Sequence, residues 1–199
     1  MNRRKKILIS LLLPGVLCLA GLGIGMVYKA AAPSGIAKWE MKSAAVYDEN
    51  MSLIITRMRE EGFDVALWQE NKPETVTNPD YSRSADVKTI GIAGDCSILF
   101  PNSNALPAGE TGYCILGEKT AWQLFGSTKV DGRSVLINEK TYQVAGIQFQ
   151  EEELCVYELT PDTEQEVAFA AIQYDKREQK DMGKRRLEML GGLTLIACG

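Results

Sequence analysis

Histidine is absent from the 199-residue sequence. Because histidine is the usual base of serine and cysteine triads and a common zinc ligand, the histidine-bearing forms of these sites are excluded. The five cysteines are also spaced so that no C-x-x-C pair occurs. No catalytic, cofactor-binding or metal-ligating residue is therefore predicted, and we expect that the protein is not an enzyme.

Charge is absent from another part of the chain, since no charged residue occurs between Ile7 and Val27. An apolar run of this length matches the roughly 20 residues that a helix needs to cross a bilayer. The basic cluster Arg3–Lys6 precedes the run, so the positive-inside rule predicts a cytoplasmic N-terminus and an extracytoplasmic remainder. Residues 1–29 are interpreted as a cytoplasmic basic tip and a single transmembrane helix in the cell membrane.

A cleaved signal peptide is the alternative to a retained helix. The apolar run of a signal peptide is shorter than this one, and a cut after Ala32 would place Pro33 directly behind the cleavage site. We therefore expect the helix to be retained. Residues 30–38 are then a linker of small residues, and residues 39–199 are one ectodomain close to the bilayer.

The ectodomain is acidic. Four of the 22 basic residues precede the apolar run, whereas all 26 acidic residues follow it. A surface of this charge binds nucleic acid poorly and is repelled by anionic lipid headgroups. Nucleic acid is excluded as a partner, and contact with the membrane is expected only through the N-terminal helix.

The most regular stretch of the sequence begins at Gly117 with a short helical pattern. Ala121, Leu124 and Phe125 fall at positions i, i+3 and i+4, so they share one face of a helix, and Gly126 supplies the left-handed residue that ends it. The pattern predicts a helix of about two turns with one buried side.

Two runs with period-2 alternation follow the Asp131-Gly132 turn, on either side of the loop Asn138–Lys140. They predict a β-hairpin with one buried face. The residues of that face are Val135, Ile137, Tyr142 and Val144.

The order of these features resembles the extracytoplasmic core domain of MacB/FtsX-type ABC transporter permeases. The matching residues in this sequence are Ala121, Leu124–Gly126, Gly132, residues 135–137 and Tyr142–Ile147. An earlier strand and a leucine, glycine, acidic segment of that domain are similar to Val87–Ile92, Phe100, Leu106 and Gly109-Glu110. The resemblance covers residues 87–147.

The rest of the chain supplies alternating strand and helix patterns. Before residue 87 we expect a strand at 43–47, a helix at 50–61, a strand at 65–68 and an exposed loop at 70–86. The inner face of that helix is predicted to carry Leu53, Ile54 and Met58. After residue 147 we expect strands at 155–159, 167–174 and 193–198 and an amphipathic helix at 176–190.

The predicted fold class is α+β. An N-terminal transmembrane helix is followed by a two-part extracytoplasmic domain. One part is a β-α-β arrangement built from the two ends of the chain, and the other is an inserted β-rich part with a short helix at about residues 87–159.

The resemblance implies a non-catalytic domain that couples conformational change of an ABC transporter to a substrate or partner outside the membrane. An ABC ATPase subunit and other permease segments are the implied partners, together with an extracytoplasmic protein. Permeases of this family carry three further membrane helices after the ectodomain, which this sequence lacks. The alternatives are a truncated or split permease, or a single-pass anchored adaptor that regulates a partner without transport.

Two kinds of site residue are singled out in the ectodomain. Cys96 and Cys114 are the candidate disulfide to test in an oxidising compartment, and buried free thiols are the alternative. Trp122 lies next to Ala121 on the short helix and is the candidate contact with a partner, for which partial burial is the alternative.

Overall fold

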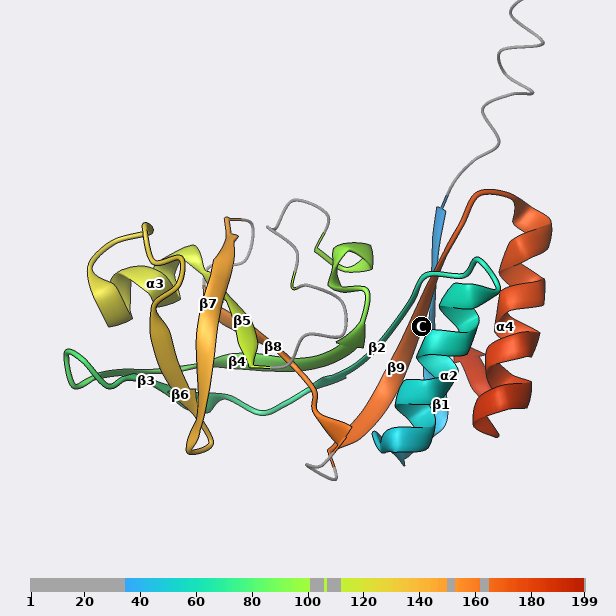
Figure 1. The fold of residues 1–199 in the computed structure, drawn as a ribbon, viewed down its shortest axis with the longest axis horizontal. Coiled ribbons are helices and arrows are strands. Elements are labelled where there is room, and N and C mark those ends of the chain that lie inside the picture. The colour runs from blue at the N-terminus through green and yellow to red at the C-terminus, as the bar shows by residue number, and fades with distance from the viewer. Residues whose placement is uncertain (1–34, 101–105, 107–111, 150–152, 162–164, 199) are drawn as a thin grey trace, which may run out of the picture.

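The computed structural model describes residues 35–100, 106, 112–149, 153–161 and 165–198. Within these residues it has helices α2 (Glu49–Glu60), α3 (Glu118–Phe125) and α4 (Arg177–Gly191), and a 3-10 turn η1 (Cys96–Ile98). The strands are β1 (Gly35–Val46), β2 (Val65–Glu70), β3 (Glu74–Asn78), β4 (Arg83–Gly94), β5 (Tyr113–Gly117), β6 (Ser134–Ile137), β7 (Lys140–Gln148), β8 (Leu154–Glu158), β9 (Glu166–Tyr174) and β10 (Leu195–Ala197). The predicted α+β class is confirmed (Figure 1).

The predicted transmembrane segment and the segment Gly109-Glu110 lie outside the described residues. Of the helices that are described, none has the length and the apolar character needed to cross a bilayer.

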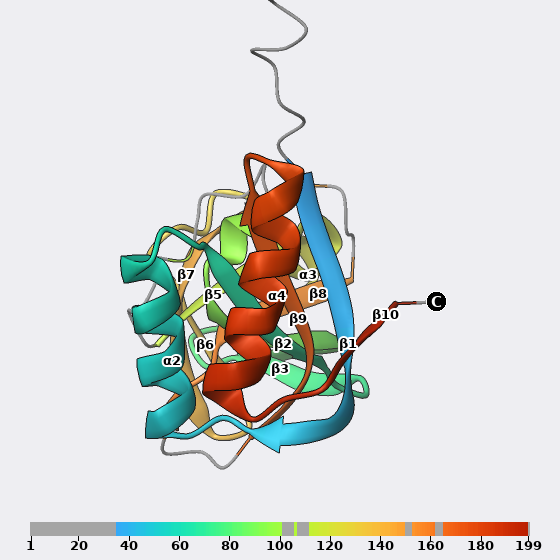
Figure 2. The same ribbon diagram turned by 90° about the vertical axis from the view of Figure 1, so that its right-hand side faces the viewer.

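One half of the molecule is built from the two ends of the described chain. Strand β1 pairs with β9 and β10, and β9 pairs with β2, all antiparallel. Helices α2 and α4 lie side by side over one face of these strands, as Figures 1 and 2 show from two directions. This helix-covered half therefore joins segments that are more than a hundred residues apart in the sequence.

The other half is a closed ring of six strands. Its order is β4-β3-β6-β7-β5-β8, and the ring closes because β8 also pairs with β4. The β4–β8 and β5–β7 pairs are parallel and the other pairs are antiparallel. Helix α3 belongs to this half and lies at the end of the molecule remote from α4 (Figure 1).

Strand β4 belongs to both halves. Its first residues pair with β3, residues 88–92 pair with β8, and residues 90–94 pair with β2. The strand is therefore bonded on both sides at Ile90, Gly91 and Ile92. Strand β4 therefore runs through both halves, and its hydrogen bonds to β2 on one side and to β8 on the other connect the ring to the helix-covered half.

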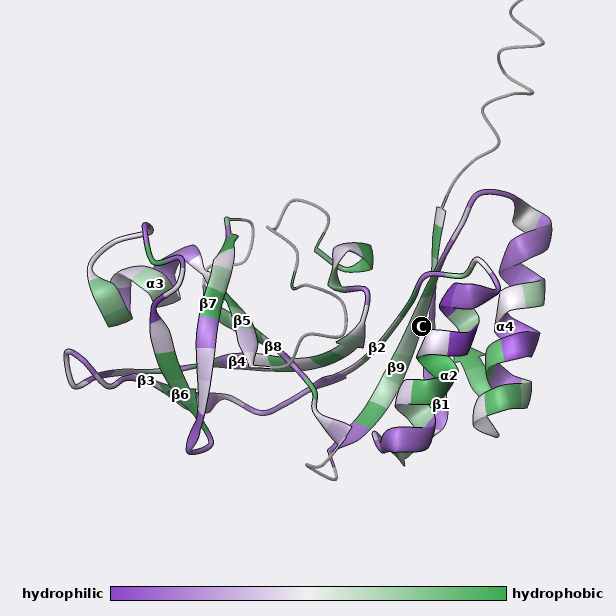
Figure 3. Cartoon of the chain, viewed as in Figure 1, coloured by the Kyte–Doolittle hydropathy of each residue, from purple (hydrophilic) through white to green (hydrophobic). Residues whose placement is uncertain are grey.

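Two hydrophobic clusters form the core. The larger one fills the ring and continues under α2 and α4. The smaller one lies on the opposite face of the sheet, where η1 residues pack on β2, β4, β8 and β9. On this face the aromatic side chains of Trp68 and Phe169 are stacked, with their centroids 5.3 Å apart. Because β9 is covered on both faces, its middle is hydrophobic in Figure 3 without the alternation of a half-exposed strand.

The face of α2 that packs inward differs from the prediction. Asp48 caps the helix by accepting a hydrogen bond from the Met51 backbone N–H at 2.8 Å. The buried stripe is then Met51, Ile55 and Met58, while Leu53 is 66% exposed. Leu53 was wrongly chosen as an inner residue, because the i, i+4, i+7 stripe that begins at Met51 was not recognised among the neighbouring apolar residues.

Two predicted boundaries were also wrong. Strand β1 begins at Gly35, inside the expected linker, and extends well before residue 43. The expected exposed loop at 70–86 contains β3 and the start of β4. Strand β3 was missed because its sequence, ETVTN, buries only Val76 and Asn78 and is otherwise polar.

The remaining elements follow the predictions closely. The α3 helix ends at Gly126 with a φ of 69°, and all four residues of the predicted hairpin face are buried. Strand β9 and helix α4 are present, with Leu187 fully buried, and α4 ends at Gly192 in the left-handed conformation.

An ion pair between α2 and α4 makes the stability dependent on pH. Arg186 Nε donates to Glu61 Oε2 at 2.6 Å, and its Nη2 donates to the other carboxylate oxygen. These hydrogen bonds lower the pKa of Glu61 below its ordinary value of 4.5. The pair therefore stabilises the fold above pH 4.5, and this contribution is lost as the pH falls through the lowered pKa.

The expected result is that Arg186→Gln lowers the free energy of unfolding near neutral pH, and that the difference from the natural protein shrinks in acid. Urea unfolding of the full chain, followed by circular dichroism at several pH values, measures this. Arg185→Gln removes the same charge from the next residue and is the control. An equal pH dependence for both variants would contradict the assignment.

Candidate interaction surface

The described residues contain no group of histidine, cysteine, aspartate or glutamate side chains arranged to hold a metal ion. The functional features that the structure does offer are exposed apolar side chains. They occur on α3 and at the end of β7, on α2, and on α4.

Helix α3 is held firmly at the end of the ring. Buried Thr120 accepts a hydrogen bond from the Leu154 backbone N–H at 3.2 Å through its hydroxyl oxygen. Near the other end of the helix, the Asn78 side-chain amide donates to the Leu124 carbonyl oxygen at 3.0 Å. Both anchors come from strands distant in sequence, so the orientation of α3 is fixed by the ring.

The outer side of α3 carries an exposed aromatic residue. Thr120, Ala121 and Leu124 face the ring, whereas Trp122 is 54% exposed. Gly117, directly before the helix, pairs with Gln148 at the end of β7, and the next residue, Phe149, is 63% exposed. We call Trp122 and Phe149 the aromatic pair of the ring.

Exposed aromatic side chains on a rigid element are typical anchors of protein interfaces. The exposure of Trp122 agrees with the role expected for it, and that role stays a prediction. Strict alternation from buried Tyr142 and Val144 directs Phe149 to the other, exposed face, so the sequence contained this signal although it was not used. Strand β7 ends at Gln148, and the side chain of Phe149, directly after it, is exposed to solvent.

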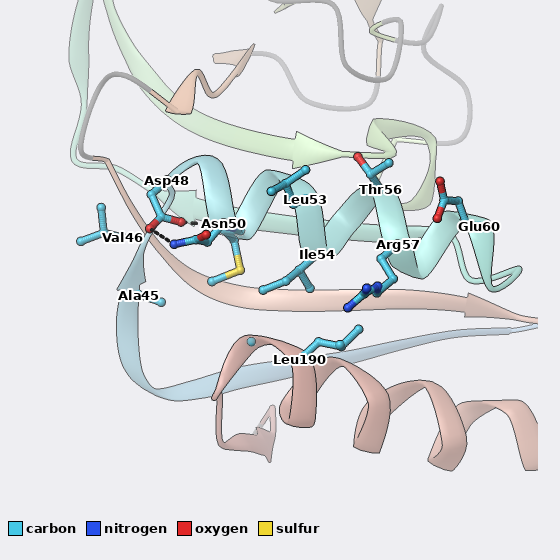
Figure 4. A pocket seen from close by; sticks show the side chains of 12 residues that line it. Ala45, Val46, Asp48, Asn50, Leu53, Ile54, Thr56, Arg57, Glu60 and Leu190 are labelled. Atoms are coloured by element: carbon cyan, nitrogen blue, oxygen red, sulfur yellow. Dashed lines mark hydrogen bonds between the residues drawn. The ribbon is translucent and has the colours of Figure 1, made fainter.

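A groove of about 850 Å³ lies between α2, the end of β1 and the end of α4. In Figure 4, Ile54 and Arg57 point from α2 toward Leu190, while Leu53 points away from α4. Asp48, Arg57 and Glu60 also line the groove, so its wall is partly apolar and partly charged. A second, shallower hollow of about 560 Å³ follows the outer face of α4, where Met182 and Met189 are exposed.

The cysteines are placed differently from the predicted pairing. Cys96 belongs to the smaller hydrophobic cluster and Cys114 to the larger one, and both are buried free thiols. Burial raises the pKa of the Cys96 thiol to about 12. The cysteine that interacts with Cys114 is Cys155, on the neighbouring strand β8. A Cys96–Cys114 disulfide stays an untested prediction, and the structure gives it no support.

The fold was compared with those of known proteins. No protein-family model and no curated protein sequence matches the chain. Among solved structures, the extracellular domain of the ABC-type transporter YknZ from Gram-positive bacteria matches with a TM-score of 0.55 and 16% identity, over 81% of this chain and 100% of that one. The periplasmic region of MacB from Actinobacillus actinomycetemcomitans matches with a TM-score of 0.59 and 9% identity, over 81% of this chain and 87% of that one.

The chain has the fold of these transporter domains. The structural likeness extends well beyond residues 87–147, where the sequence resembles the MacB/FtsX-type core domain, and includes the helix-covered half. At identities of 16% and 9% the likeness concerns the fold, and the functional assignment rests on further argument.

Proposed function

We propose that the chain is a non-catalytic, membrane-anchored extracytoplasmic domain of an ABC transporter permease. In this role it couples conformational change of the transporter to a substrate or partner outside the membrane. The observation that carries the proposal is the match over the full length of the YknZ extracellular domain.

The start of the described chain supports the anchoring. The apolar run ends at Val27, and β1 begins at Gly35, only a few residues later. A domain tethered this closely follows the movement of its membrane helix. The basic cluster Arg3–Lys6 favours a cytoplasmic N-terminus, so the ectodomain is assigned to the outer side of a single-pass chain in the cell membrane.

The chemistry that drives transport is assigned to other subunits. An ABC ATPase subunit would hydrolyse ATP on the cytoplasmic side, and separate permease segments would complete the membrane path. The aromatic pair of the ring is the surface assigned to an extracytoplasmic protein partner. No cofactor is part of the proposal.

The test is detergent co-purification of the tagged chain from its native membrane, with bound proteins identified by mass spectrometry. Recovery of an ABC ATPase or a multi-span permease is expected. Recovery of the chain alone, or with only soluble extracytoplasmic proteins, would overturn the transporter assignment and favour a single-pass adaptor.

A matched pair of variants tests the aromatic pair of the ring. Trp122→Ala is expected to reduce recovery of an extracytoplasmic partner by roughly tenfold or more, because exposed tryptophans are frequent binding hot spots. Gln123→Ala changes the next exposed residue of α3 and is expected to leave recovery unchanged. The free energy of unfolding should change by no more than about 0.5 kcal/mol in either variant. Equal recovery with both variants would contradict the assignment of Trp122.

The orientation is testable through Cys198. Cys198 is exposed, whereas the other cysteines in the described part of the chain are buried. A membrane-impermeant maleimide is therefore expected to label Cys198 on intact cells, or on spheroplasts if an outer membrane is present. Cys198→Ser is the control. Labelling that requires lysis of the cytoplasmic membrane would place the domain inside and overturn the proposed topology.

A further inference from the structure

Two cysteines that the sequence does not pair are brought together inside the ring. In the antiparallel β5–β8 pair, Leu116 lies opposite Cys155 and Cys114 lies opposite Tyr157. Cys114 and Cys155 are therefore diagonal neighbours on adjacent strands. The Cα atoms of diagonal neighbours are about 7–8 Å apart, which is at the upper limit of the distance that a disulfide spans.

The two thiols share one face and one environment. Strand alternation directs Cys114, Leu116, Cys155 and Tyr157 into the larger cluster, whereas Ile115 and Val156 belong to the smaller one. Both cysteines have no exposed surface. Cys114 is the first cause of the raised pKa of Cys155, so the two side chains interact, and a small approach of β5 and β8 would complete the bond.

We propose that Cys114 and Cys155 form a disulfide between β5 and β8 when the chain folds in an oxidising compartment. Its occurrence in cells rests on the extracytoplasmic location given in the proposed function. The pairing itself rests only on the register of β5 and β8, and the two parts can be tested separately.

The topology selects this pair among the cysteines of the described chain. Cys96 lies in the other hydrophobic cluster, across the sheet from Cys114. Cys198 follows β10, which is at the opposite end of the strand order from β5 and β8. A disulfide of either one with Cys114 or Cys155 would require rearrangement of the sheet, because neither one lies beside them on the same face of neighbouring strands.

The bond forms by thiol–disulfide exchange with a small or protein disulfide as oxidant. One cysteine thiolate attacks the oxidant, which releases one thiolate and leaves a mixed disulfide. The second cysteine thiolate then attacks the mixed disulfide and releases the other thiolate. The two cysteines lose two protons and two electrons in total, and the oxidant is reduced to two thiols.

The exchange belongs to folding rather than to the folded state. In the finished ring, the interaction with Cys114 and burial raise the pKa of Cys155, and neither thiol has access to an oxidant. The same burial protects the finished disulfide from reductants. The bond is therefore expected to behave as a structural disulfide.

The cross-link would close a loop that contains α3, β6 and β7. A loop of about 40 residues restricts the unfolded chain strongly, and the expected gain in the melting temperature is roughly 10 °C. The bond would also fix the closure of the ring, because β8 is the strand that pairs with both β4 and β5.

The first experiment refolds the full chain in a buffer of oxidised and reduced glutathione, alkylates the remaining thiols, and maps disulfide-linked peptides by mass spectrometry. A peptide pair that contains Cys114 and Cys155 is expected. It should persist in Cys96→Ala and be absent in Cys155→Ala. Natural chain refolded with a reductant in place of the glutathione mixture should melt roughly 10 °C lower than the oxidised chain. A Cys96–Cys114 peptide, or folded chain with all thiols free, would overturn the pairing.

The second experiment alkylates cells directly before lysis and maps the same peptides from the membrane fraction. The Cys114–Cys155 peptide is expected there as well. If the pair forms during refolding and both thiols are free in cells, the pairing is supported and the extracytoplasmic location is contradicted. If it forms in neither experiment, the pairing is wrong whatever the location of the domain.

Discussion

Replacing Gly94 with alanine is expected to lower the free energy of unfolding by about 3–5 kcal/mol, enough to unfold many domains. Gly94 has a φ of 93°, and an added Cβ would lie 2.2 Å from the backbone oxygen of Val65. That oxygen accepts a hydrogen bond from the Asp95 backbone N–H at 2.8 Å, so it cannot move aside without breaking the β2–β4 junction. Backbone strain and the steric clash therefore act together.

Gly62 provides the matched control, because it has a φ of 84° and nothing within 4 Å of an added Cβ. Gly62→Ala meets only the left-handed backbone conformation, which is unfavourable by about 1–2 kcal/mol for an alanine. Urea unfolding of both variants, followed by circular dichroism, separates the two contributions. Similar losses at the two positions would show that the contact with the Val65 oxygen is unimportant.

The second large effect is expected at Tyr157, which is 1% exposed and lies inside the ring. Its hydroxyl oxygen accepts hydrogen bonds from the side-chain amides of Asn71 at 3.0 Å and Gln165 at 3.2 Å. Asn71 follows β2 and Gln165 precedes β9, so Tyr157 ties the ring to the strands of the helix-covered half. The aromatic side chain of Tyr157 also packs against that of Tyr142, and the centroids of the two aromatic rings are 5.3 Å apart.

Tyr157→Phe keeps the packing of the aromatic side chain but removes the hydroxyl that accepts hydrogen bonds from two amides. The free energy of unfolding is expected to fall by about 1–3 kcal/mol. Tyr157→Ala also leaves a cavity, and the expected loss rises to about 3–5 kcal/mol. Tyr81→Phe removes a hydroxyl from a tyrosine that is 55% exposed, and the free energy of unfolding should change by less than about 0.5 kcal/mol. If the Tyr157 and Tyr81 hydroxyl deletions had equal effects, the bridge between the halves would make no contribution.

Local sequence patterns were sufficient to predict an element where a single residue or strict alternation determines its end or its buried face. Gly126 ended α3, and strict alternation identified the buried face of the β6–β7 hairpin. They failed for β3, where the polar sequence is compatible with a strand only because β4 and β6 pair with it on either side. The parallel β4–β8 pair that closes the ring joins residues more than sixty positions apart, and no local signal encodes such a pair.

The same distinction applies to the site residues. The exposure of Trp122 follows from its position on α3, opposite a buried stripe that the sequence already reveals. The neighbour of Cys114 depends on the register between β5 and β8, which is set by the closure of the whole ring. Sequence spacing therefore made Trp122 a candidate for exposure, with partial burial as the alternative, and could not identify the neighbouring thiols.

The strand shared by the two halves has a mechanical meaning. Rotating the ring against the helix-covered half would require breaking ladder hydrogen bonds along β4, which pairs with β2, β3 and β8. The domain therefore has no soft hinge at its waist. In the arrangement proposed above, a displacement applied at Gly35 by the membrane helix would reach α3 through one rigid body, with the aromatic pair of the ring at its far end.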